Sequence, residues 1–145
     1  MDEYFARDIM KEDVITIEHS AAVTEAARKM AEKEIGCVIV TNQGRPIGIL
    51  TERDIVRLVS LNKSPMSSSV SEVMSSPLIS LSPDDSIWEL AEEMKIRKIH
   101  KMPIVHENKV VGIVTTSDIT RLCSIGSDSE MRLVCQQILQ RLNQP

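Results

Sequence analysis

Two short motifs in this sequence carry residue types that could bind a ligand. Each has a glycine, two apolar residues, a threonine and, three positions later, an aspartate: Gly48 to Asp54 and Gly112 to Asp118. Threonine and an acid at this spacing form a capping box, in which both side chains bond backbone N–H groups where a helix begins. The N–H groups and dipole at a helix start also favour an anion such as phosphate. The motif alone fits a plain helix cap or a ligand site, and both alternatives remain open.

The sequence contains none of the usual arrangements for catalysis or metal binding. No Ser/His/Asp or Cys/His constellation stands out, and neither a P-loop nor a dinucleotide-binding fingerprint is present. The three histidines, His19, His100 and His106, lack the spacing of metal ligands. We therefore expect no catalytic residues and no metal site, and we expect that the chain is not an enzyme.

Composition limits the possible partners. The chain has 145 residues, a net charge of −4 and scattered basic residues, so it lacks the basic stripe typical of nucleic-acid binding, which makes nucleic acid an improbable partner. It has no apolar run of about 18 residues, so no membrane span is expected. Its start, Met1-Asp2-Glu3, is acidic where a signal peptide would be basic. Cys37, Cys123 and Cys135 have no CxxC spacing and indicate thiols in a reducing cytoplasm.

Both motifs belong to an internal repeat. Met10 matches Met74, 64 positions later, and at this offset thirteen residues are identical between 10–59 and 74–123. The period is longer than the ~20 to 50 residues of a solenoid repeat. The repeat predicts two like modules folded against each other as a pseudo-symmetric pair, with ligand sites at or near their mutual cleft.

Each copy predicts the same order of elements, strand, helix, two strands and helix. The strands are expected at 14–17, 37–40 and 47–50 in the first copy and at 78–81, 102–105 and 110–114 in the second. Apolar residues at helical spacing predict the middle helices, and Thr51 and Thr115 begin the final ones. The expected fold class is α/β (α+β), with two β-α-β-β-α modules packed sheet to sheet and a C-terminal helix.

The same patterns predict four segments. Residues 1–61 form the first repeat with a short N-terminal helix at about 3–10, residues 62–71 a serine-rich linker without a helical stripe, and residues 72–124 the second repeat. Residues 125–145 form a polar turn and an amphipathic helix. That helix either packs back on its own domain or provides a face for self-association or partner docking. Its apolar stripe consists of Met131, Val134, Cys135, Ile138, Leu139 and Leu142.

The paired β-α-β-β-α order, with Gly48-Ile-Leu-Thr-Glu-Arg-Asp54 and Gly112-Ile-Val-Thr-Thr-Ser-Asp118, resembles the cystathionine-β-synthase (CBS) domain. Two such domains in tandem form a Bateman module, and the resemblance covers residues 6–124. It implies adenosine-containing ligands, namely AMP, ADP or ATP, with S-adenosylmethionine or NAD possible, bound in clefts between the paired sheets. It implies no required cofactor, and it implies a homodimer.

The resemblance also implies which residues bind. In the second site Asp118 would take the ribose, Thr115 and Ser117 would supply hydroxyl contacts, and His100 and Lys101 would hold phosphate. The first site would use Asp54 with Thr51 and Arg53. The adenine pockets would be lined by Ile15, Thr16, Val38, Pro77, Leu78, Ile79 and Met102. Gly36-Cys37 replaces the His-Lys pair in the first copy, so the two sites should be unequal for polyphosphates.

The function this implies is that of a stand-alone regulatory module. It would bind an adenosine-containing small molecule and signal to an effector protein of unknown identity by a conformational change. The alternative is a dimeric scaffold that binds no ligand and captures its partner through the C-terminal helix.

Overall fold

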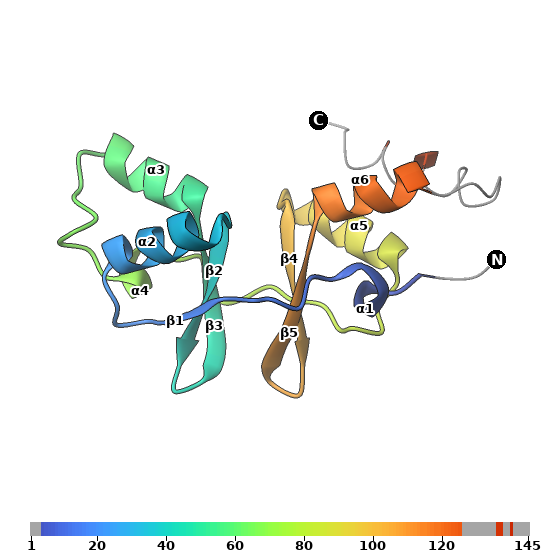
Figure 1. Ribbon diagram of the computed structural model, residues 1–145, viewed down its shortest axis with the longest axis horizontal. Coiled ribbons are helices and arrows are strands. Elements are labelled where there is room, and N and C mark those ends of the chain that lie inside the picture. Colours follow the sequence, from blue (N-terminus) through green and yellow to red (C-terminus); the bar gives the residue numbers. More distant parts are fainter. Residues whose placement is uncertain (1–3, 126–135, 138–139, 141–145) are drawn as a thin grey trace. The chain divides into compact units, whose positions relative to one another are not determined.

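The computed structural model describes residues 4–125, 136–137 and 140 (Figure 1). The described chain divides into two compact units. Val14–Ile79 forms one unit, called here the first module. The second module combines the described residues up to Asp13 with those from Ser80 onward. The start of the predicted first repeat therefore belongs to the second module.

The first module is a three-stranded sheet with helices packed against it (Figure 1). The sheet order is β1-β2-β3, in which β1 is parallel to β2 and β2 is antiparallel to β3. Its elements are β1 (Thr16–Glu18), α2 (Val23–Lys33), β2 (Cys37–Asn42), β3 (Arg45–Thr51), α3 (Glu52–Ser60) and α4 (Val70–Val73). The β2–β3 turn places Gln43 and Gly44 at φ 52° and 81°, as a two-residue hairpin turn of type I′ requires.

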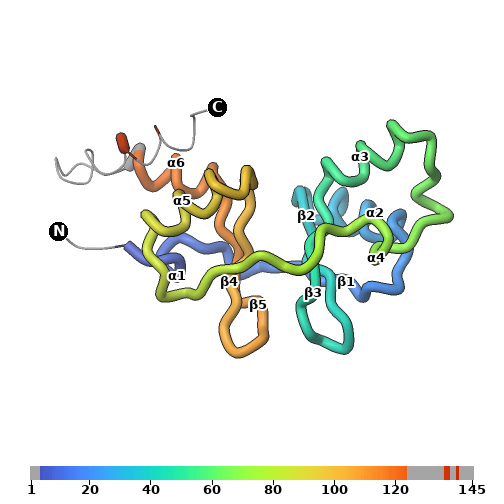
Figure 2. The backbone as a smooth tube through the Cα atoms, turned by 180° about the vertical axis from the view of Figure 1, so that it is seen from behind, coloured from blue at the N-terminus to red at the C-terminus, as the bar shows by residue number. Residues whose placement is uncertain are grey.

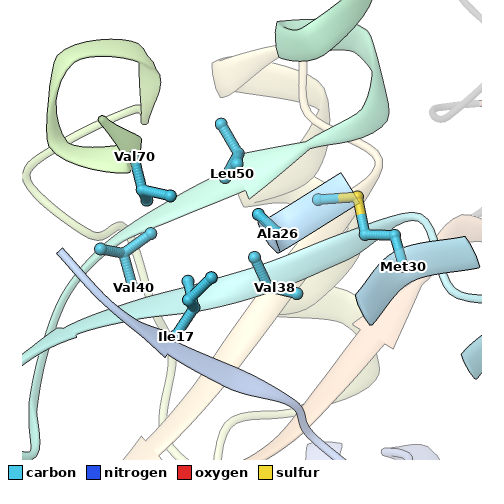
Figure 3. Packing of buried hydrophobic residues seen from close by; sticks show 7 residues of the cluster. All are labelled: Ile17, Ala26, Met30, Val38, Val40, Leu50 and Val70. Atoms are coloured by element: carbon cyan, nitrogen blue, oxygen red, sulfur yellow. The ribbon is translucent and has the colours of Figure 1, made fainter. Parts of the chain in front are cut away.

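The core of the first module follows from the two periodicities of the sequence. Val38 and Val40 alternate along β2 and point to one face of the sheet, where Ala26 and Met30 lie one turn apart on α2 (Figure 3). The same buried cluster is completed by Ile17, Leu50 and Val70. The strand pattern and the helical stripe therefore meet as the sequence predicts.

The second module repeats this plan with a smaller sheet. Its elements are α1 (Ala6–Ile9), α5 (Ile87–Arg97), β4 (Lys101–His106), β5 (Lys109–Thr115) and α6 (Thr116–Ile125). The antiparallel pair β4–β5 forms the second hairpin (Figure 2). At the start of α5 the Ser86 hydroxyl accepts a bond from Glu89 N at 3.1 Å, as expected for a serine cap. The fold is therefore α+β with two small sheets.

The strand expected at 78–81 is not formed, and this prediction is wrong. Leu81 alone makes a parallel bridge, to Ile104. In the first module the ladder continues because His19 N donates to Thr41 O at 2.9 Å. Pro83 occupies the position of His19 in the second repeat and has no N–H to donate. The second sheet therefore lacks the counterpart of β1.

The expected linker also differs from the structure at its end. Helix α4 begins at Val70, inside the segment 62–71, for which the sequence shows no helical stripe. Backbone bonds hold this stretch on the first module: Val70 N donates to Ala21 O at 2.8 Å and Ser71 N to His19 O at 3.0 Å. A four-residue helix is too short to show a hydrophobic stripe in the sequence, which explains the miss.

Two further expectations concern the cysteines and the C-terminal end. Cys37 is a thiol, as expected, but Cys123 is disulfide-bonded, which contradicts the prediction of thiols throughout. Of the predicted C-terminal helix, residues 136, 137 and 140 are helical, and the rest, with its apolar stripe, lies outside the described residues. No helix in the described ranges is long and apolar enough to cross a membrane.

Candidate functional site

The threonine–aspartate motif of the second module forms a complete capping box at the start of α6. The Oδ2 atom of Asp118 accepts bonds from the backbone N of Thr115 at 2.8 Å and from its hydroxyl at 3.0 Å. The N of Asp118 donates back to the Thr115 hydroxyl at 3.2 Å. These bonds fix the carboxylate at the point where β5 passes into α6.

The first module has the same arrangement with nearly the same distances. Asp54 Oδ2 accepts from the N and the hydroxyl of Thr51 at 2.9 and 3.0 Å, and Asp54 N donates to that hydroxyl at 3.3 Å. The helix-cap interpretation is thus confirmed in both copies. In each copy the cap uses only Oδ2 of the aspartate, so the other carboxylate oxygen, Oδ1, has no role in the cap.

The two Oδ1 atoms have different surroundings. Asp118 Oδ1 lies 3.3 Å from Nη1 of Arg121 and 3.6 Å from Nζ of Lys11. The Asp118 side chain is 3% exposed, whereas both cationic side chains are 58% exposed. Among the described residues of the first module, no cation pairs with Asp54. The carboxylate in the second module is therefore neutralised by its neighbours, and the one in the first module is not.

Lys11 was not predicted as a site residue from the sequence. It lies beside Asp118 because the first residues of each repeat, called here its leading segment, pair with the hairpin of the other repeat. Lys11 lies near the start of the first repeat, yet it pairs with Ile113 of β5 in the second: Lys11 N donates to Ile113 O at 2.9 Å, and Ile113 N donates to Lys11 O at 3.0 Å. In the first module Ser75, which lies near the start of the second repeat, pairs in the same way with Ile49 of β3, at 2.9 and 3.0 Å. In both modules, the leading segment of one repeat thus pairs with the hairpin of the other repeat, which is the exchange of leading segments referred to below.

A glycine in each motif permits this close approach. A Cβ at Gly112 would lie 2.5 Å from Sδ of Met10, and a Cβ at Gly48 would lie 2.7 Å from the backbone O of Ser75 and 2.8 Å from Sδ of Met74. The sequence repeat includes both partners of this contact, since Met10 matches Met74 and Gly48 matches Gly112. The match does not reveal which hairpin each methionine covers.

The residues expected to hold phosphate lie beside the cap of the second module. The backbone O of His100 accepts a bond from Thr116 N at 3.1 Å, and Lys101 lies opposite Thr115 in the β4–β5 register. Ser117 is exposed in the first turn of α6. The structure therefore brings His100, Lys101, Thr115, Ser117 and Asp118 together at one helix start.

The first module has the same backbone with different side chains. Gly36 O accepts from Glu52 N at 3.0 Å, and Cys37 lies opposite Thr51. Arg53 is exposed in the first turn of α3, beside Asp54. The positions of His100 and Lys101 are thus filled by residues without a basic side chain, and Arg53 is the basic residue of this helix start.

The residues expected to line the adenine pockets are divided between the two modules. Val38 and Met102 are fully buried within their modules. Ile15 is half-buried against the core of the first module, and Thr16 is exposed. The three remaining residues, Pro77, Leu78 and Ile79, belong to the first module, whereas Asp118 belongs to the second. The structure does not bring these three into one unit with Asp118.

Comparison with protein-family models identifies the repeat. The model described as CBS domain matches the chain twice, at residues 6–61 and 70–124. The chain belongs to the CBS domain family. It contains a tandem pair of CBS domains, and the expectation drawn from the two glycine-to-aspartate motifs is confirmed.

Solved structures agree with this assignment. The CBS domain pair of protein MJ0100, crystallised with 5′-methylthioadenosine and S-adenosyl-L-methionine, has a TM-score of 0.77 to this chain at 29% identity. The match covers 85% of this chain and 98% of that one. The fold of the described residues is thus that of a CBS pair.

Curated relatives share the same region with this chain. An uncharacterised protein of Methanopyrus kandleri is 38% identical over 118 residues, which cover 79% of this chain and 60% of that protein. A homoserine O-acetyltransferase of Methanohalobium evestigatum is 34% identical over 120 residues, which cover 81% of this chain and 24% of that enzyme. The chain therefore spans only part of the length of both relatives.

Proposed function

We propose that this chain is a regulatory module that binds an adenosine-containing ligand of the AMP, ADP or ATP class at its CBS motifs and signals to a partner protein by a conformational change. S-Adenosylmethionine is a further ligand of the same chemistry. The observation that carries the proposal is the state of the two aspartates, because each is held by a capping box that leaves Oδ1 outside the cap. The related CBS pair of known structure was solved with two adenosine-containing ligands.

A carboxylate held in this way is suited to a ribose. An ionised carboxylate accepts hydrogen bonds that are stronger than those between neutral groups, and two neighbouring hydroxyls can donate to it together. The bonds from Thr115 to Asp118 fix the acceptor before the ligand arrives, which lowers the entropic cost of binding. The proposed ribose and hydroxyl contacts are Asp118, Thr115 and Ser117 in the second module and Asp54 and Thr51 in the first.

Phosphate groups would bind at the helix starts beside these aspartates. The first N–H groups of α6 and α3 and the helix dipoles favour an anion there. In the second module the proposal adds His100 and Lys101, whose backbone adjoins the start of α6. In the first module it adds Arg53 alone. The two sites are therefore proposed to differ in their affinity for polyphosphates.

The regulatory role is a second part of the proposal. CBS regions fill most of the described chain, so we assign it binding and not catalysis. A bound ligand would change the affinity for an effector protein by a coupling free energy of about 1–3 kcal/mol, the usual range for allosteric pairs. We place the module in the cytoplasm as a homodimer.

The proposal is tested by titration calorimetry and thermal unfolding with AMP, ADP, ATP, S-adenosylmethionine, NADH and GTP. A ligand at a hundredfold excess over its Kd stabilises the native state by about 2.7 kcal/mol. We expect the adenine ligands to raise the Tm and GTP to fail. We expect Asp118→Asn to weaken binding at the second site about tenfold or more, since it removes a charged acceptor.

A matched control separates loss of the ligand contact from loss of a helix cap. Ser86→Ala removes the cap of α5 in the same module and should lower stability without changing affinity. If Ser86→Ala weakens binding as much as Asp118→Asn does, Asp118 acts only through folding and its assigned role is refuted. If no adenine ligand shifts the wild-type Tm, the ligand-binding function is refuted and the scaffold hypothesis is favoured.

A further inference from the structure

We infer that Lys11 makes the second site selective for anionic adenosine ligands, such as a nucleoside monophosphate, and that the first site lacks this selectivity. The inference deepens the proposed function and rests on it. Lys11 lies outside the glycine-to-aspartate motifs and is brought to Asp118 by the exchange of leading segments.

The first observation behind this inference is the set of charges around Asp118. One carboxylate, with a single negative charge, lies within 3.6 Å of two cations, Lys11 and Arg121. Of these two cations, Lys11 is the one that comes from outside α6 and its motif. When ribose hydroxyls donate to Asp118 Oδ1, the ammonium group of Lys11 remains beside the ligand, and a negative group on the ligand can form a charge-assisted bond with it. A neutral nucleoside offers no such group and must compete with Lys11 for Oδ1.

The first module supplies the comparison within the same chain. Ser75 occupies the position of Lys11 in both the repeat and the backbone pairing, and it carries no charge. Arg57 is the repeat counterpart of Arg121, but no ion pair joins it to Asp54 in the described part of the chain. The first site therefore has no cation at the position of Lys11, and its affinity should depend less on a negative charge of the ligand.

The backbone of Lys11 is held firmly while its side chain is partly free to reach a ligand. Two bonds to Ile113 and the packing of Met10 on Gly112 fix the backbone. The side chain is 58% exposed, so its ammonium group, with three donors, can bond Asp118 and a ligand phosphate at once. The pairing thus positions a cation without burying it.

The test compares AMP with adenosine in the full chain. An Asp54→Asn background silences the first site, so calorimetry reports the second site alone. We expect Lys11→Ser, which installs the residue found at position 75, to weaken AMP binding about tenfold, the effect of losing one bond to a charged group. Adenosine binding should stay equal or become tighter. Lys11→Arg should keep the preference for AMP, and added salt should reduce that preference only when a cation is present at position 11.

The reciprocal exchange tests the first site. In an Asp118→Asn background, Ser75→Lys should raise the affinity for AMP relative to adenosine. Lys11 is rejected as the selective residue if Lys11→Ser changes both affinities by the same factor at unchanged Tm. If the wild-type chain binds neither AMP nor adenosine, the proposed function falls and the inference falls with it. If it binds both and Lys11→Ser prefers AMP over adenosine as strongly as the wild type does, the inference alone is overturned.

Discussion

The substitution Gly112→Ala should destabilise the second module by overpacking. The added methyl group would lie 2.5, 2.7 and 2.9 Å from Sδ, Cγ and Cβ of Met10, whereas carbon and sulfur atoms in contact are separated by about 3.5–4 Å. Met10 or the β5 backbone must therefore move. Overpacking of this kind costs about 1–3 kcal/mol. In a chain of this size each kcal/mol lowers the Tm by about 4 °C.

Chemical unfolding of four proteins measures the effect: wild type, Gly112→Ala, Met10→Ala and the double variant. Met10→Ala removes Sδ and Cγ, two of the three close atoms, so it should relieve part of the strain. We expect the double variant to be more stable than the sum of the single effects predicts, by about 0.5–3 kcal/mol, the range for residues in contact. Gly48→Ala with Met74→Ala is the matched control, and there the rescue should be smaller because the nearest atom, Ser75 O, belongs to the backbone.

Additive single effects at Gly112 and Met10 would refute the reasoning. They would mean that Met10 does not lie over Gly112, so the leading segment of the first repeat would not pack on β5. Lys11 follows Met10 directly, and its pairing with Asp118 would lose its support as well.

Two further substitutions test the cap and the core. Thr115→Val keeps the shape of the side chain but removes the hydroxyl that bonds Asp118, and it should lower the free energy of unfolding by about 0.5–2 kcal/mol; an unchanged urea midpoint would show that the cap contributes nothing. Leu50→Ala empties a fully buried position of the first module and should cost about 2–5 kcal/mol, whereas Ile96→Ala, at an exposed position of α5, should stay within about 0.5 kcal/mol in the same assay.

Much of the local structure could be predicted because it depends on neighbouring residues. The apolar stripe of α2 and the capping boxes at Thr51 and Thr115 act over three or four positions, and the structure contains each of them. The strand expected at 78–81 shows that a single substitution between the two copies can prevent an element that the repeat predicts. The pattern at 78–81 matches a strand, but Pro83 removes the donor that would extend the ladder.

What could not be predicted depends on which distant segments meet. Nothing in the order of residues tells whether Met10 and Lys11 pack on their own repeat or on the other one, since both repeats offer the same glycine and the same apolar strand. The residues assigned to the second site from the sequence therefore did not include Lys11, the cation that this pairing brings to Asp118.

The exchange of leading segments gives the two copies a way to diverge while their motifs stay alike. Thr51 and Asp54 match Thr115 and Asp118 in type and in bond lengths, because the cap must form for either helix to begin. A change in the motif itself would alter the fold and the site together. Positions 11 and 75 avoid this conflict, since they pair through backbone atoms that any residue except proline supplies. Lysine at one and serine at the other can thus set the charge beside each aspartate without cost to either cap. On this reasoning the side chain at each exchanged position, more than the shared motif, decides which charge of ligand a CBS site of this chain accepts.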